Sequence, residues 1–180
     1  MPWFNKLGAA LLLVSIVIPA HTSAAAPTPQ KKKEYLSESE ADRIRDAGAT
    51  GPRIVLFTKF ASDRIKKLQY EFAHMDPADQ KRSERLNGLI NSYAGCIDDA
   101  ADLIDIGIEK QQDIREGVKA LQAGLKEFLP YLQGLVTGGP ERETYKINLD
   151  DAIEATQDAG KEIERASKDL APPPVRRKPS

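Results

Sequence analysis

Four carboxylates at helical spacing give this sequence its clearest potential for metal chemistry. The row comprises Asp98, Asp102, Asp105 and Glu109, with Asp99 beside it. Calcium and other hard cations take about six to eight oxygen ligands, and one straight row of side chains presents too few of them to a single ion. The apolar residues Ile97 and Ile104 place the row on the side of the expected helix that faces away from the core. We therefore interpret the row as a solvated acidic face, with cation binding as the alternative.

Histidine and cysteine offer little catalytic or redox chemistry in this chain. A di-iron site in a helical bundle needs a Glu-x-x-His pair on each of two helices, and Glu71 with His74 provides it once. His74 precedes Asp76-Pro77 at an expected helix end, which predicts an exposed capping or loop histidine. Cys96 has no identifiable base with a third residue to orient it. The sequence predicts no catalytic, cofactor-binding or metal-binding residue, no cofactor, and a protein that is not an enzyme.

Arg64 and Glu71 lie close to the apolar stripe of an expected helix, one heptad apart. If they face the interior, both need partners, because an unpaired buried charge is costly. We favour the simpler arrangement, in which the long side chains lie along the edge of the core with their charged ends in water. Basic residues also gather in this part of the chain, which predicts ion pairs between neighbouring elements or, alternatively, a surface for an anionic ligand. They are Arg43, Arg45, Arg53, Arg64, Lys66 and Lys67.

The first residues have the pattern of an export signal. Lys6 precedes an apolar run from Leu7 to Ile18, Pro19 ends the run, and small residues follow up to Ala25. The run is too short for a spanning helix, which needs ~20 residues. We predict a cleavable signal peptide over residues 1–25 and a periplasmic or secreted protein, with an uncleaved anchor as the alternative.

Cys96 is the single cysteine of the 180 residues, so no disulfide can form within the chain. In an oxidising compartment such a cysteine is either buried or paired with another chain. We favour burial, because Cys96 lies on the apolar side of its expected helix, and the intermolecular disulfide stays open.

The remaining residues divide into a linker, one domain and a tail. Residues 26–34 lack apolar periodicity and predict a flexible linker, residues 35–171 a helical domain, and residues 172–180 a disordered proline-rich basic tail. Arg176-Arg177-Lys178 in this tail would give weak contact with a membrane surface. The formal net charge of −1 argues against a nucleic-acid-binding protein, which normally carries a basic excess.

Apolar periodicity predicts an all-α fold, an up-and-down antiparallel bundle of four long helices plus a short N-terminal helix. Ser37 and Glu40 have capping-box spacing at the start of the short helix, with Ile44 as its main buried residue and Leu36 packing back on it. The four long helices are expected from Pro52 to about His74, from between Pro77 and Ser83 to about Lys110, from Asp113 with Glu116 to Gly138, and from Leu149 to Leu170. In the last of these, we expect the core-facing row to be Leu149, Ile153, Thr156, Gly160, Ile163, Ser167 and Leu170.

The first third of the chain resembles a family of exported bacterial all-helical proteins of unknown function. The resemblance rests on Tyr35-Leu36-Ser37-Glu38-Ser39-Glu40, on Arg43-Ile44-Arg45-Asp46-Ala47, and on Arg53-Ile54-Val55-Leu56-Phe57 with Phe60-Ala61. It implies a secreted bundle and brings no activity, ligand or catalytic residue.

The leading functional hypothesis is a structural or protein-interaction role in the cell envelope, with an unidentified protein partner or self-association. The alternative is a small-ligand or metal-binding periplasmic bundle that uses Arg64, Glu71 and His74, or the acidic row.

Overall fold

The computed structural model describes residues 35–76 and 78–169, which belong to the compact unit Lys33–Ser180. The predicted signal peptide (1–25), linker (26–34) and basic tail (172–180) lie outside the described residues, as does Leu170, the expected end of the last helix.

Every regular element among the described residues is a helix, which confirms the all-α prediction. In chain order they are α1 (Glu38–Asp46), α2 (Thr50–Ala73), α3 (Arg82–Glu109), α4 (Arg115–Gly138) and α5 (Arg142–Asp169). The short first helix and the four long ones match the expected number of elements.

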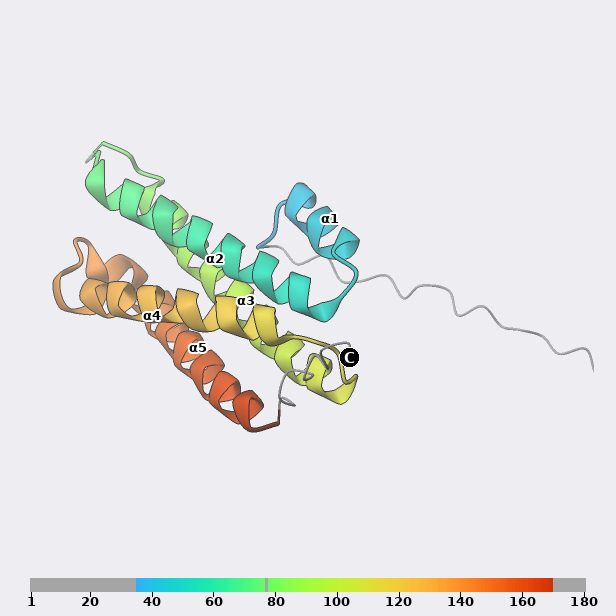
Figure 1. Cartoon of the computed structure of the whole chain (residues 1–180). Coiled ribbons are helices and arrows are strands. Elements are labelled where there is room, and N and C mark those ends of the chain that lie inside the picture. Colours follow the sequence, from blue (N-terminus) through green and yellow to red (C-terminus); the bar gives the residue numbers. More distant parts are fainter. Residues whose placement is uncertain (1–34, 77, 170–180) are drawn as a thin grey trace, which may run out of the picture. The chain divides into compact units, whose positions relative to one another are not determined.

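The four long helices form an up-and-down bundle, in which consecutive helices run in opposite directions (Figure 1). α2 packs on α3 and α4, α5 packs on the same two helices, and α1 packs on α2. Each long helix therefore has one antiparallel neighbour and one parallel neighbour. The N-terminal turns of α2 and α4 lie together at Gly51 and Gly117, and α3 and α5 are joined in parallel register by Asn87–Asn148 and Tyr93–Thr156.

Apolar rows at three- and four-residue steps along α3 and α4 form the centre of the core. Every residue of these two rows is buried, with exposed fractions from 0% to 8%. They are Leu86, Ile90, Tyr93, Ile97, Ala100 and Ile104 of α3, and Ile114, Val118, Leu121, Leu125, Phe128, Leu132 and Leu135 at the start of and along α4. Pro130 is exposed on α4, on the side away from the core.

The start and the core-facing row of α5 differ from the prediction. The helix begins at Arg142 rather than Leu149, and the aromatic ring of Tyr145 in this additional stretch is buried. The Tyr145 hydroxyl donates to the Pro140 carbonyl, with an O–O distance of 2.8 Å. The buried row is Tyr145, Leu149, Ala152, Thr156, Ala159, Ile163 and Ala166.

The prediction was therefore wrong for three residues of the α5 row. Ile153 and Gly160 are half-buried and Ser167 is exposed. The physical reason is that alanine fills the core positions beside them, because small side chains let α5 approach its neighbours closely.

The helix α4 starts at Arg115 rather than at Asp113, where the sequence predicted its start together with Glu116. Ile114 is the N-cap and no side chain caps the helix. Asp113 instead accepts from the backbone N–H of Arg115 at 3.2 Å and pairs with its guanidinium at 2.6 Å. The cause is burial of Ile114, whose side chain packs directly against Gly107 of α3.

The capping box of α1 is confirmed. The Ser37 hydroxyl accepts from the backbone N–H of Glu40, and the Glu40 carboxylate accepts from the Ser37 N–H at 2.9 Å. Ile44 is only half-buried, whereas Leu36, just before the helix, is 8% exposed. The main apolar anchor of this segment is thus Leu36 rather than Ile44, since the contacts of α1 with the long helices are made chiefly to α2.

Candidate functional site

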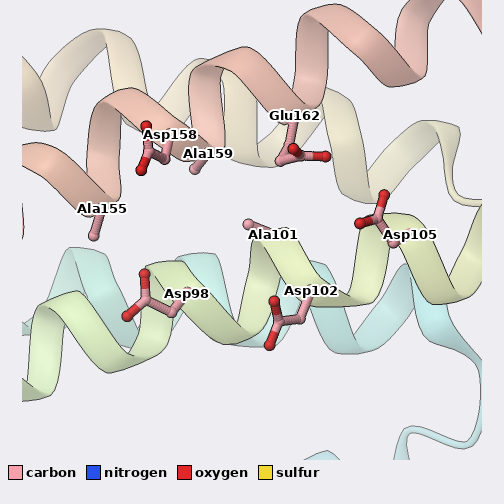
Figure 2. A pocket seen from close by; sticks show the side chains of 8 residues that line it. All are labelled: Asp98, Ala101, Asp102, Asp105, Ala155, Asp158, Ala159 and Glu162. Atoms are coloured by element: carbon pink, nitrogen blue, oxygen red, sulfur yellow. The ribbon is translucent and has the colours of Figure 1, made fainter.

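A groove lies between the parallel helices α3 and α5, with a cavity volume of about 250 Å³ (Figure 2). Its lining residues are of two kinds, alanines and carboxylates. They are Asp98, Ala101, Asp102 and Asp105 of α3, and Ala155, Asp158, Ala159 and Glu162 of α5. We call this site the acidic groove.

The alanines form the floor of the acidic groove and the carboxylates stand along its walls. Figure 2 shows Ala101 of α3 pointing toward Ala155 and Ala159 of α5 across the gap between the helices. The three α3 carboxylates are exposed, as predicted for the acidic row. Glu109, the fourth member of that row, is exposed as well but does not line the groove.

Charge inside the acidic groove is only partly compensated. The Arg165 guanidinium pairs with Asp105 and with Glu162, which joins the two walls at one end. Lys161 donates to Asp158 at 2.7 Å. Desolvation, together with the negative charges of Asp102 and Asp158, raises the pKa of the Asp98 carboxyl. The groove therefore holds five carboxylates against two cations.

These carboxylates are spread along the helices rather than gathered around one point (Figure 2). Within residues 35–76 and 78–169, no group of three or more His, Cys, Asp or Glu side chains is arranged to hold a metal ion. The part of the chain that the structure describes thus provides no set of ligands for a cation at the acidic row, which was the alternative interpretation.

The α5 wall was missed at the sequence level. Asp158 and Glu162 stand four residues apart on a strongly charged helix, so their spacing alone marks only another solvated face. The signal that distinguishes them is the alanine pair Ala155 and Ala159 beside them, which allows α5 to lie against α3.

His74 and Cys96 are located as predicted. His74 is exposed at the end of α2, its Nδ1 lies 2.9 Å from the Tyr70 carbonyl oxygen, and its ring stacks on that of Tyr70 at 4.1 Å. Cys96 is buried at 0% exposure, so an intermolecular disulfide would require local opening of the fold.

Arg64 contradicts the prediction that its charged end reaches water. The residue is 7% exposed, and both of its terminal nitrogens pair with the Glu40 carboxylate of α1, Nη2 to Oε2 at 2.7 Å. Arg64 also donates to the Tyr35 carbonyl at 3.3 Å. Its hydrogen bonds to Glu40 lower the pKa of that carboxyl to about 2. The physical reason is that α1 folds back over α2 and supplies a partner for the buried charge.

Glu71 is half-buried and also lacks a free charged end. Its carboxylate accepts from Arg85 at 3.0 Å and lies 3.5 Å from Arg82. Arg82, which the sequence did not single out, is 4% exposed and donates to Glu141 at 2.8 Å and to the Glu71 carbonyl at 2.7 Å. These pairs tie α2, α3 and the α4–α5 turn together at one end of the bundle.

The predicted pairing of the basic residues between elements is realised by Arg64. Arg45 pairs with Asp42 of its own helix at 2.6 Å. Arg43 lies over the Phe60 ring of α2, 5.1 Å from its centre. The contacts of Arg64 and Arg43 join α1 to α2, whereas the Arg45 pair stays within α1.

A second, more apolar groove lies at the N-terminal turns of α2 and α4, with a cavity volume of about 540 Å³. Its residues are Gly51, Pro52, Val55, Leu56, Asp113 and Glu116. Val55, 37% exposed, is the large apolar side chain here that reaches the surface.

Fold and site together define the class of this protein: an all-α helical bundle with an acidic groove between two parallel helices. No helix in the described ranges combines the length and apolarity needed to span a bilayer. Neither a protein-family model, nor a curated protein, nor a solved structure matches the chain.

Proposed function

We propose that this protein is an exported interaction protein of the cell envelope that binds a basic, helical segment of a partner protein in the acidic groove. The observation that carries the proposal is the composition of that groove, in which five carboxylates from two helices flank a floor of three alanines. The role rests on this surface and requires no catalytic residue.

Charge and shape each favour a basic helix as the bound segment. The uncompensated carboxylates attract Lys and Arg side chains and steer a cationic partner toward the groove. The small side chains of Ala101, Ala155 and Ala159 permit close approach of another helix between α3 and α5.

We expect that neutralising the groove weakens binding of a basic helical peptide about tenfold. The variant Asp98→Asn, Asp102→Asn, Asp158→Asn removes three carboxylates, and exposed charge pairs of ~0.5 kcal/mol each add to roughly 1.5 kcal/mol. The probe is a fluorescein-labelled alanine-based peptide with lysine at every fourth position. Fluorescence anisotropy at several salt concentrations measures its affinity, which falls with added salt if charge drives binding.

The matched control removes the same number of charges elsewhere on the bundle. Glu84→Gln, Glu116→Gln, Glu127→Gln neutralises three exposed carboxylates that do not line the acidic groove. If this control lowers the affinity for the peptide as much as the groove variant does, binding depends on the net charge of the protein rather than on the groove. The groove proposal is then wrong. A rise in melting temperature with calcium chloride that only the groove variant abolishes would make the groove a cation site instead.

Export makes a separate prediction about the mature chain. When the full sequence is expressed in a Gram-negative host, we expect the periplasmic fraction to contain a chain that lacks residues 1–25, since the segment has the pattern of a cleavable signal. Intact-mass spectrometry of that fraction measures the cleavage site. Recovery of the uncut chain in the cytoplasm would contradict export, and recovery of the uncut chain in membranes would support the anchor.

A further inference from the structure

The helix α1 is attached to the bundle through very few buried groups. None of its own residues is buried, and α2 is the long helix on which it packs. The segment just before it contributes Leu36, which is 8% exposed, and Tyr35, whose carbonyl accepts from Arg64. Segments with few buried apolar contacts open at a lower free energy than the core of the same protein.

One carboxylate both caps α1 and holds it in place. Glu40 accepts from the Ser37 N–H at 2.9 Å and the Ser37 hydroxyl at 3.0 Å, which completes the capping box. The same carboxylate pairs with Arg64, and the two side chains are only 15% and 8% exposed. Because Arg64 belongs to the core-facing side of α2, this pair is the main polar link between α1 and the bundle.

Cys96 of α3 lies near this link. The Tyr35 ring covers Gly95 so closely that a Cβ built on that glycine would lie 2.8 Å from the ring. The next residue is Cys96, at 0% exposure, and it interacts electrostatically with the Arg64 guanidinium. Tyr35 thus covers the α3 backbone next to Cys96, and Arg64, which pairs with α1, lies near enough to the thiol to interact with it.

Three residues, 47–49, separate α1 from α2. Gly48 has a φ of +65°, a backbone conformation that glycine adopts without the steric cost paid by other residues. The connection between α1 and α2 is therefore short, and Gly48 provides its left-handed turn.

We propose that α1 is a detachable strap: it opens as a unit about residues 47–49 while the four long helices stay folded, and its release uncovers Arg64 and the Cys96 thiol. In the closed state the Glu40–Arg64 pair satisfies a buried charge. In the open state the guanidinium reaches water, and the Cys96 thiol becomes accessible to reagents in solution. The buried cysteine is then a conditionally reactive one.

The single cysteine provides a direct measure of strap opening. The probe is dithiobis(nitrobenzoate), an aromatic disulfide: the Cys96 thiolate attacks one sulfur, a mixed disulfide forms, and the coloured nitrothiobenzoate leaves with the electron pair of the broken S–S bond. We expect Glu40→Gln to raise the labelling rate at least about tenfold, because it leaves the Arg64 charge without its counter-ion. Far-UV circular dichroism and the urea midpoint report whether the four long helices remain folded.

Asp42→Asn is the matched control, since it removes a carboxylate of the same helix whose pair with Arg45 is exposed. We expect its labelling rate to equal that of the unaltered protein. Equal rates in the Glu40 and Asp42 variants would overturn the proposal.

A second measurement tests the proposal even if the Glu40 variant fails to fold. In the unaltered protein, the labelling rate should rise with urea less steeply than global unfolding does, because strap opening exposes little surface. A urea dependence equal to that of global unfolding would show that Cys96 is reached only when the whole bundle opens, and the strap would be refuted.

Discussion

Replacing Gly117 with alanine is expected to lower the free energy of unfolding by about 2 kcal/mol, although alanine is normally the better helix former. A Cβ at this position of α4 would lie 2.8 Å from the Gly51 carbonyl oxygen and 2.9 Å from the Ile54 Cβ. The first of these is backbone, so it cannot move aside as the end of a flexible side chain can. The parallel helices α2 and α4 would have to separate at their N-terminal turns. Urea unfolding followed by circular dichroism measures the change.

Gly134→Ala on the same helix is the matched control. No atom lies within 4 Å of a Cβ built there, so the ordinary helix preference applies and we expect a gain of up to ~1 kcal/mol. If both glycine variants stabilise the protein, the close crossing of α2 and α4 at Gly117 is not correct.

Replacing Thr156 with valine is expected to cost about 2 kcal/mol, because it leaves a hydroxyl without a partner in the core. The Thr156 hydroxyl donates to the Ala152 carbonyl at 2.6 Å. Its oxygen therefore accepts from the Tyr93 hydroxyl, 2.8 Å away. Tyr93 is 0% exposed, and burial raises the pKa of its phenol, so neither water nor ionisation compensates for the lost acceptor. Thermal and urea unfolding measure the loss.

The hydrogen bond between Tyr93 and Thr156 can also be tested by a double-mutant cycle, which compares the stability losses of the single and double variants. Tyr93→Phe alone should cost about 1 kcal/mol, because Thr156 keeps its bond to Ala152. The double variant Tyr93→Phe, Thr156→Val has no stranded polar group and should be more stable than Thr156→Val alone. Simple addition of the two losses would show that these hydroxyls are not bonded across α3 and α5.

The sequence predicts the helices well wherever apolar residues are large. The rows of α3 and α4 alternate Leu, Ile, Phe and Tyr at three- and four-residue steps, so their core faces follow from apolar periodicity alone. In α5, alanine occupies three of the buried positions. Alanine fits a core face and an exposed face equally well, so the predicted row included Ile153, Gly160 and Ser167 in place of the buried Ala152, Ala159 and Ala166.

Contacts between elements far apart in sequence could not be predicted from apolar periodicity. Periodicity gives the direction in which Arg64 points on its own helix, but its partner depends on how α1 folds back onto α2. The acidic groove is a similar case. Its α3 wall follows from the position of Ile97 and Ile104, whereas its α5 wall depends on which helix lies beside α3.

The parallel neighbours in the bundle have a consequence for how the chain folds. α2 and α4 each contain 24 residues, and α3 and α5 each contain 28, so the bundle consists of two helical hairpins of matched dimensions stacked side by side. Each hairpin closes over a short connection, but the bonds between hairpins join residues 57 to 63 positions apart. Bringing such distant residues together costs chain entropy before the stabilising contacts between the hairpins form. We therefore expect docking of the two hairpins, rather than formation of either one, to be the slow step of folding.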